Sequence, residues 1–538
     1  MLEADVILTG GRVLTAREDL PEAAAVAVRD GRILRVGSEE EVLACRSRDT
    51  RVIHLNGRSL IPGVIESHNH MQHGVMQDVV DCSPRAVKSI DDIKSRITER
   101  ADNSNPGEWI VARGYDQTKL AEGRHPTRWD LDEAAPENPV LLIRTCSHVS
   151  VANSQAMEAV GVSEDDPDPP AGSMDRNRGR LTGVLREMAQ QPIKKEAMRV
   201  SRERWRHGHP VTARYYHRFG ITSSHELTGD DANMISTMIE ASREGDLPLR
   251  VYQCVRERGH VQVGANAMRA GLITGLGNEW IRLGPYKITM DGSIGGATAA
   301  MREPYINEQH CGIPYMEQDE IDDLVGRIHT AGYQLAVHAI GDQAIEMTLD
   351  AVERAITRHP RQDHRHRIEH CGIMDPVLLE RMADLEMVAA PQPPFIYYLG
   401  DSYVTNLGIE RVRNIYPFRS YIDYGIPACY GSDYPVVDIN PLVGIYAAVT
   451  RKTERETELG AEEAVSIHEA IRGYTYWGAY ASFEEDIKGT LTPGKLADMC
   501  VLSDDILAVE TEDIPGIKVD LTMVGGDLVY QRSEDGCP

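Results

Sequence analysis

The feature that most limits the fold of this chain is a repeated alternation of short apolar runs and helical stretches. The apolar runs have the length and β-branched content of buried strands, and they recur roughly every 30 to 60 residues. Helical patterns fill the intervals, as over residues 319–331 and 341–358. Parallel strands need long crossovers, so this rhythm predicts repeated β-α units and a parallel sheet.

The number of such runs favours a closed barrel. The candidate strands cover residues 60–65, 220–224, 249–254, 286–290, 334–338, 366–370, 387–390 and 428–433. Eight parallel strands close a (β/α)8 barrel, which gathers functional side chains at the carboxyl ends of its strands. We therefore expect the α/β class and a TIM barrel over residues 61–480.

Both ends of the chain carry a different pattern, in which short alternating runs flank glycine turns. Gly10-Gly11 and Gly525-Gly526 each lie between two apolar runs, and Asp30-Gly31 is a strong hairpin signal. We expect residues 1–60 and 481–538 to form one small β-sandwich. Two unrelated sheet edges are the alternative.

A long insertion follows the first barrel strand and covers residues 78–215. It contains a helical run near residues 90–101 and strand-like runs at residues 109–112 and 140–143. This is too much chain for a simple loop, so the insertion predicts a cap or a substrate-binding segment.

Composition and charge narrow the class of partner. The chain has 538 residues and a formal net charge of −26, which disfavours nonspecific binding to nucleic acid or to an anionic membrane. Its 9 cysteines include no CxxC pair, and we see no signal peptide and no apolar run long enough to span a bilayer. We expect a cytoplasmic enzyme with a small-molecule substrate; homo-oligomer formation stays open.

Metal-ligating side chains recur at the predicted strand ends. They are His68 and His70 in a His-x-His pair, His338, His370 and Asp433. Each has an ordinary structural explanation alone, but a barrel brings such strand ends to one cavity. Imidazole and carboxylate without thiolate favour zinc, with iron, manganese or nickel as alternatives.

Lys287 is the unusual member, because it ends the fourth predicted strand before Asp291-Gly292-Ser293. An ammonium group has no lone pair for a metal. If the neutral amine captures CO₂, the resulting carbamate has two oxygens that can bridge two ions. An ordinary salt-bridging lysine is the alternative.

These residues resemble the amidohydrolase superfamily across nearly the whole chain. The resemblance rests on Pro62–His70, Lys287 before Asp291-Gly292-Ser293, His338, His370, Asp433 and Gly489–Asp498. The insertion resembles the amidohydrolase family 3 branch, which includes N-substituted formamide deformylases. The segments that carry this resemblance are Gly114–Gln117, Ser147-His148, Asn153-Ser154 and Gly183–Glu187.

The resemblance implies a role for each metal ligand. His68, His70 and Asp433 would hold the more buried ion, and His338 and His370 the second. Lys287, as carboxylysine, would bridge them together with a hydroxide. Members of the family hold one or two ions. One departure is Glu66, where the family pattern usually has Asp.

The implied reaction is attack of a metal-activated hydroxide on a polarised carbonyl. We expect Asp433 to take the proton and deliver it to the leaving nitrogen. His148 is the candidate donor to the developing oxyanion, with a structural role in the cap as the alternative.

Substrate contacts are expected from the insertion and from the segment after the seventh strand. The candidates are Tyr115, Gln117, Gln392, Phe395 and Tyr397. Aromatic residues are scarce in this chain, so the cluster around Phe395 favours a substrate with an apolar portion, and packing of the cap is the alternative.

The leading hypothesis is a metal-dependent hydrolase of a carbon–nitrogen bond, such as an amide or an N-substituted formamide. The alternatives are a cyclic-amide hydrolase, a deaminase, an esterase and a non-catalytic binding protein. Lys287 argues against the deaminase form, and the full ligand set argues against a protein that has lost catalysis.

Overall fold

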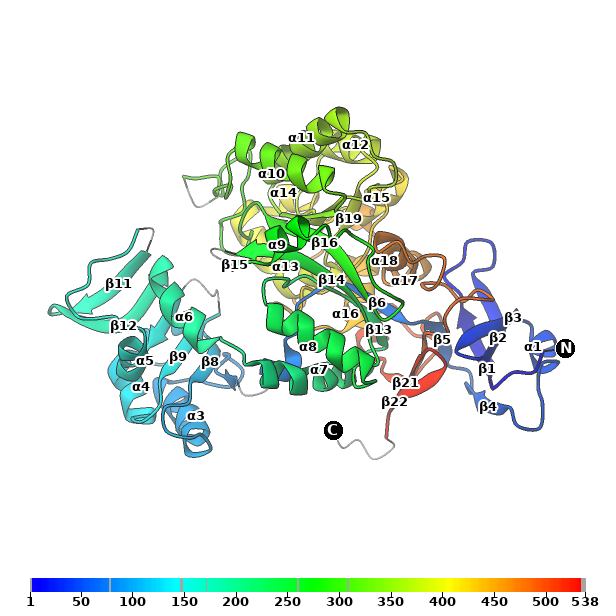
Figure 1. Ribbon diagram of the computed structural model, residues 1–538, viewed down its shortest axis with the longest axis horizontal. Helices are drawn as coiled ribbons and strands as arrows, with labels where there is room; N and C mark the ends of the chain where they lie inside the picture. The colour runs from blue at the N-terminus through cyan, green and yellow to red at the C-terminus, as the bar shows by residue number, and fades with distance from the viewer. Residues whose placement is uncertain are drawn as a thin grey trace. The chain divides into compact units, whose positions relative to one another are not determined.

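The chain folds into two compact units (Figure 1), seen in a computed structural model that describes residues 2–76, 79–145, 149–170, 172–258, 261–306 and 309–533. Contacts group Met1–Gly74 with Trp205–Pro538 as the first unit and Val75–Arg204 as the second. Among the residues in these ranges, no helix is both long and apolar enough to cross a membrane.

The first unit contains a parallel sheet of order β19-β18-β17-β16-β14-β13-β6. Its strands are β6 (Val64–Asn69), β13 (Ile221–Glu226), β14 (Arg250–Arg258), β16 (Ile281–Thr289), β17 (Leu335–Ala339), β18 (Arg367–His370) and β19 (Val388–Ala390), with β15 (Val261–Gln262) beside β14. The helices that alternate with or follow these strands are α7 (Arg202–His217), α8 (Ala232–Arg243), α9 (Val263–Arg269), α10 (Gln318–Thr330), α11 (Asp342–Arg358), α12 (Pro376–Asp384), α13 (Pro393–Leu407), α14 (Ile409–Val412), α15 (Phe418–Asp423), α16 (Pro441–Thr450), α17 (Ile467–Gly473) and α18 (Tyr476–Ala481).

Residues 428–434 close this sheet into a ring although they form no regular strand. Ala428 bridges Ala389 of β19, and Tyr434 bridges Asn69 of β6, both in parallel register. Asp433 N–H also donates to the His68 carbonyl at 2.7 Å. The result is a TIM-like barrel, as the strand–helix alternation predicts.

The run at residues 60–65 is not one barrel strand, as the sequence suggested. The chain divides at Gly63: β5 (Ser59–Pro62) pairs with the terminal strands, and β6 enters the barrel. A Cβ atom at Gly63 would lie 2.2 Å from Thr222 Oγ1, so the crossing between the two sheets requires glycine.

Strands from both ends of the chain share one sheet, of order β22-β21-β20-β5-β1-β2-β3, with β4 beside β1. Its other members are β1 (Val6–Leu14), β2 (Glu22–Arg29), β3 (Arg32–Gly37), β4 (Arg51–His54), β20 (Met499–Leu502), β21 (Val519–Val524) and β22 (Asp527–Gln531), with α1 (Glu39–Leu43) after β3. The hairpin at Asp30-Gly31 is confirmed. The prediction of a turn at Gly10-Gly11 is wrong, because β1 is continuous there and its register shift against β2 is a bulge.

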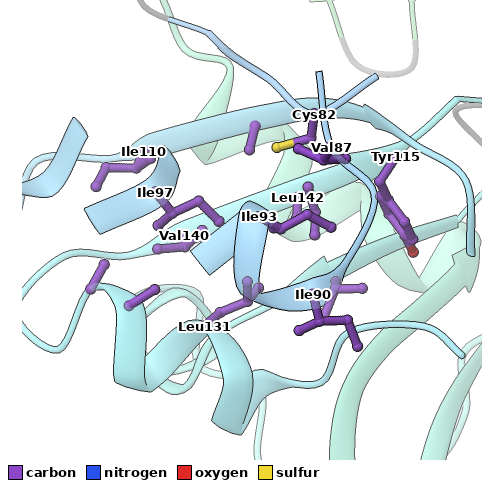
Figure 2. Close-up of a cluster of buried hydrophobic side chains, with 14 of the residues drawn as sticks. Cys82, Val87, Ile90, Ile93, Ile97, Ile110, Tyr115, Leu131, Val140 and Leu142 are labelled. Carbon is purple, nitrogen blue, oxygen red and sulfur yellow. The ribbon is translucent and has the colours of Figure 1, made fainter. Parts of the chain in front are cut away.

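The second unit is built on a six-stranded sheet of order β11-β12-β10-β9-β8-β7. Its elements are β7 (Val80–Asp81), β8 (Ile110–Tyr115), β9 (Val140–Arg144), β10 (Val149–Ala152), β11 (Gly172–Asn177), β12 (Arg180–Glu187), α3 (Ile90–Asp102), α4 (Arg128–Ala134), α5 (Ser154–Ala159) and α6 (Gln191–Ala197), preceded by α2 (His73–Met76). Figure 2 shows Ile90, Ile93 and Ile97 of α3 in a buried cluster with Val140 and Leu142 of the sheet.

Candidate metal centre

The six residues that the sequence indicates as metal ligands meet at the carboxyl end of the barrel. They are His68 in β6, His70 just after it, Lys287 in β16, His338 in β17, His370 at the end of β18 and Asp433 in the closing segment. Residues i and i+2 of a strand face the same side, which places the His-x-His pair on one face.

His68, His70 and Asp433 form a compact group whose potential ligand atoms all lie within 4.8 Å of one another. Asp433 Oδ1 lies 3.4 Å from His68 Nε2 and 3.2 Å from His70 Nε2. His68 and Asp433 are buried, and His70 is half-buried. Two imidazoles and one carboxylate match the donor set of three-ligand metal sites that keep open positions.

Contacts at the second ring nitrogen fix the orientations of the His68 and His70 rings. His68 Nδ1 lies 2.6 Å from Glu369 Oε2, and His70 Nδ1 lies 3.1 Å from Thr228 Oγ1. An ionised carboxylate can only accept, so His68 Nδ1 carries a proton, and a neutral ring turns its Nε2 lone pair toward Asp433. Lone pairs that converge on one point are stabilised by a cation between them.

His338 and His370 lie beside this group and are also held by their second nitrogen. Their ring centroids are 4.4 Å apart, and the His370 and His68 centroids are 4.8 Å apart. His370 Nδ1 donates to Gln392 Oε1 at 2.5 Å, which leaves Nε2 free. His338 Nε2 donates to the Gly292 carbonyl at 3.1 Å, which leaves Nδ1 free as a ligand atom.

Burial and neighbouring charges favour the neutral form of His338 and His370 and the ionised form of Asp433. Burial, with the charge of Lys287, lowers the pKa of His338 to about 3, and burial also holds the pKa of His370 well below its usual value. Burial alone would raise the pKa of Asp433, but its interactions with His68 and His70 outweigh burial and hold that pKa well below its usual value. Both states are the ones that bind a metal.

Lys287 is buried at this centre, and its side chain makes no hydrogen bond or ion pair with any residue that the structure describes. Burial lowers its pKa to about 8 against the opposing charges of Glu369 and Asp433. A substantial fraction of this amine is therefore neutral near physiological pH, unlike an exposed lysine.

Glu66, the departure from the family pattern, is buried beneath the same ligands. Its Oε1 accepts from Ser432 N–H at 2.7 Å and His68 N–H at 3.3 Å, so it fastens the closing segment to β6. Burial raises the pKa of Glu66 to about 8. The glutamate lies behind the ligand pair.

Sequence reasoning missed Arg367 and Glu369, which are buried next to the ligands. Arg367 Nε donates to Glu369 Oε1 at 2.5 Å, and the same carboxylate holds His68. Burial opposes ionisation of Glu369, but the charge of Arg367 outweighs it and holds the pKa of this carboxyl well below its usual value. Two charged residues at alternate positions of a buried strand were the available signal.

The residues predicted to contact substrate fall in several places. Phe395 stacks at 6.0 Å from the His370 ring, and Tyr397 packs at 5.9 Å from Tyr446. Gln392 is buried, and its amide is engaged by His370 and by the Ala390 carbonyl, at 2.7 Å for the latter, so its place is behind a ligand.

The remaining predicted residues belong to the insertion. Within the second unit, Tyr115 O–H lies 2.8 Å from His125 Nδ1, and Gln117 Oε1 accepts from Arg144 Nε at 2.7 Å. His148 lies outside the described residues.

This geometry fits a divalent metal. The donors are imidazole and carboxylate, burial favours the neutral form of His338 and His370, and each ring has a partner on its other nitrogen, as metal-binding histidines do. The model for the amidohydrolase family matches residues 51–530. The chain belongs to the amidohydrolase family. It is therefore a hydrolase, and its family acts on carbon–nitrogen bonds.

Full-length relatives and solved structures agree with this membership. The protein YtcJ of Bacillus subtilis is 31% identical over 97% of this chain and 99% of its own length. The N-substituted formamide deformylase of Arthrobacter pascens is 29% identical over 98% and 99%. An uncharacterized metal-dependent hydrolase from Pyrococcus horikoshii superimposes with a TM-score of 0.79 and 26% identity, over 94% of this chain and 99% of that chain.

Proposed function

We propose that this amidohydrolase cleaves the C–N bond of an amide or an N-substituted formamide with the help of one or two divalent ions, zinc first among them. The observation that carries the proposal is the convergence of His68 Nε2, His70 Nε2 and Asp433 Oδ1 on one point. The similarity to an N-substituted formamide deformylase over nearly the whole chain supports this substrate class.

His68, His70 and Asp433 would hold the more buried ion, and the free nitrogens of His338 and His370 would hold a second. Lys287 would bridge them after its amine attacks CO₂, which forms a carbamate N–C bond and releases a proton. Its burial, its lowered pKa and its lack of a described partner support this modification. When bound, such metal ions polarise a carbonyl group and make water acidic near neutral pH.

The protein's own residues move the proton. Asp433 would accept a proton from the attacking water at Oδ2, since Oδ1 faces the two histidines, and deliver it to the leaving nitrogen. Without this transfer the nitrogen would leave as a strongly basic amide anion. His148 would donate a hydrogen bond to the developing oxyanion.

Phe395, which lies against His370, would form an apolar wall of the substrate pocket, and Tyr115, Gln117 and Tyr397 would add contacts. Gln392 would add a contact as well, and its Oε1, which accepts from His370 Nδ1, would orient that ring.

The proposal includes a division into a β-sandwich from residues 1–60 and 481–538, a barrel over residues 61–480 and a cap over residues 78–215. The shared terminal sheet and the separate unit at Val75–Arg204 support this division. We also propose that the enzyme is cytoplasmic. Its partner would be a small-molecule substrate and neither nucleic acid nor a membrane.

Metal analysis combined with a substrate panel tests the proposal. The metal-stripped protein would be reloaded with Zn²⁺, Mn²⁺, Fe²⁺ or Ni²⁺ and assayed on N-substituted formamides, acyl amides, cyclic amides and esters of matched side groups. We expect turnover of the formamides or amides only in loaded protein. Full activity after complete metal removal, or turnover restricted to esters, would contradict it.

A further inference from the structure

A continuous chain of buried polar side chains runs from the barrel interior to His68. Arg367 holds both oxygens of Glu369, with Nε to Oε1 at 2.5 Å and Nη2 to Oε2 at 3.0 Å. Glu369 Oε2 in turn accepts from His68 Nδ1 at 2.6 Å. Arg367 also contacts His225 Nδ1 at 2.9 Å and donates to the Ser67 carbonyl at 2.6 Å.

The chemistry of these groups permits one arrangement of protons. A guanidinium group has donors only, so His225 accepts at Nδ1, and the Glu369 carboxylate is an acceptor for both of its partners. The proton of His68 is thereby fixed on Nδ1, and its lone pair on Nε2. Glu369, which fixes this tautomer, is itself held at both carboxylate oxygens by Arg367.

The arrangement also places a full negative charge directly behind a candidate metal ligand. Arg367 and Glu369 are both completely buried, so water screens this charge very little. A buried ion pair seldom adds stability over apolar residues of similar size. Stability alone therefore does not explain why charged groups occupy this part of the barrel.

We propose that Glu369, itself held by Arg367, is a positioning residue for the metal centre. It fixes the tautomer and ring orientation of His68 and strengthens Nε2 as a ligand through its charge. Arg367 acts one step further out, by holding both carboxylate oxygens of Glu369 in place and by tying it to the Ser67 carbonyl next to the ligand. This inference rests on the proposed metal centre, and it concerns residues outside the ligand set.

The test separates positioning from simple packing. Glu369→Gln keeps the shape, but its amide can present N–H groups to His68 Nδ1, and it leaves the Arg367 charge buried without a counter-charge. The double variant Arg367→Met with Glu369→Gln removes both charges. The matched control is Arg250→Met with Asp498→Asn, which removes another buried ion pair, of 2.6 Å, at the amino end of β14.

Each variant would be measured in three ways: Zn²⁺ affinity by chelator competition, the absorption spectrum of the Co²⁺-loaded protein, and urea unfolding of the metal-free protein. We expect the double variant to regain much of the stability lost in Glu369→Gln but to bind Zn²⁺ about 10- to 100-fold more weakly, with an altered Co²⁺ spectrum. The control pair should keep the wild-type affinity and spectrum.

Glu369→Asp gives an independent check, because it retains the charge beside Arg367 but withdraws the acceptor from His68 by one methylene group. We expect weaker Zn²⁺ binding here too, with a smaller loss of stability than in Glu369→Gln. Wild-type affinity and spectrum in the double variant and in Glu369→Asp would overturn the inference. Failure of the wild-type protein to bind Zn²⁺ would instead overturn the proposed function, and the inference with it.

Discussion

Replacing Lys287 by methionine should stabilise the metal-free protein while impairing its metal centre. Methionine has nearly the same length as lysine, so it fills the same buried space without a charge. Among the described residues, Lys287 has no hydrogen bond or ion pair that the substitution would break. The substitution removes the free-energy cost of burying an ammonium group away from water.

The size of the effect follows from the pKa of Lys287, which burial lowers from 10.5 to about 8. At about 1.4 kcal/mol per pH unit, this lowering corresponds to a cost of about 3 kcal/mol in the folded state. Below pH 8 both the folded and the unfolded chain carry the proton, and the cost is complete. Between pH 8 and 10.5 the folded protein releases its proton first, so wild-type stability rises and the advantage of Lys287→Met disappears.

The assay is urea unfolding of metal-free wild type and Lys287→Met in CO₂-depleted buffer, from pH 7 to pH 11, with Zn²⁺ stoichiometry measured on the same samples. The variant should be more stable at pH 7, match the wild type near pH 11, and hold less Zn²⁺. Lys287→Gln is the control for a polar group that has no charge and cannot form a carbamate. A variant less stable than wild type at pH 7, or one with the wild-type Zn²⁺ stoichiometry, would refute the reasoning.

Three further predictions address single side chains. Asp433→Asn should lower turnover by about 100-fold or more at equal metal occupancy; near-normal turnover in a metal-matched assay would exclude it as the proton carrier. Gln392→Leu removes the acceptor of His370 Nδ1, so chelator competition should show that Zn²⁺ binds about 10- to 100-fold more weakly. Gln392→Glu is the control, because it keeps the acceptor. Wild-type Zn²⁺ affinity in the leucine variant would contradict the role of Gln392 in holding His370. Burial lowers the pKa of His364 to about 4, so the unfolded chain binds more protons below pH 6.5, and stability should fall as the pH drops from 6.5 toward 4; a profile no steeper than that of His364→Asn would disprove this.

The barrel could be predicted because its signals are local and repeated. The barrel strands β13, β14, β16, β17, β18 and β19 lie at runs that the sequence predicts as strands, and at least one helix separates each strand from the next. The candidate ligands could be found for the same reason: each lies near the carboxyl end of a barrel strand or in the segment that closes the barrel, and parallel strands bring their carboxyl ends together. The positions of the predicted strands in the sequence were enough to place His68, His338 and His370 at the same end of the barrel.

Features that depend on close contact between distant segments could not be predicted. Gly63 divides what reads as one strand, because the side chain of Thr222 leaves no room for a Cβ atom there. Gly10-Gly11 resembles a turn, but Gly11 lies against the Arg58 carbonyl in a continuous bulged strand, where a Cβ atom would lie 2.3 Å from that oxygen. Glycine pairs mark both turns and bulges, and only the partner strand distinguishes them.

The supporting residues of the centre were missed for a related reason. Gln392 follows a buried strand and precedes an aromatic cluster, which is also the pattern of a substrate contact. Its actual partner, His370, comes from the neighbouring strand. Glu369 and His68 are separated by 301 positions along the chain. Which carboxylate supports which imidazole is a property of the closed barrel.

The backbone at the centre shows how the barrel determines the site. His370 and Asp433 both have left-handed backbone conformations, with φ values of 73° and 56°, which are uncommon for residues other than glycine and persist only where surrounding contacts impose them. For Asp433 the contact is the hydrogen bond from its N–H to the His68 carbonyl, and Gly431 beside it comes so close to β6 that a Cβ atom would lie 2.5 Å from the His68 nitrogen. The closing segment is thus pressed against the strand that carries the His-x-His pair. The contact that completes the barrel is therefore also the contact that brings the carboxylate to the imidazoles, and loosening it should weaken the fold and the metal centre together.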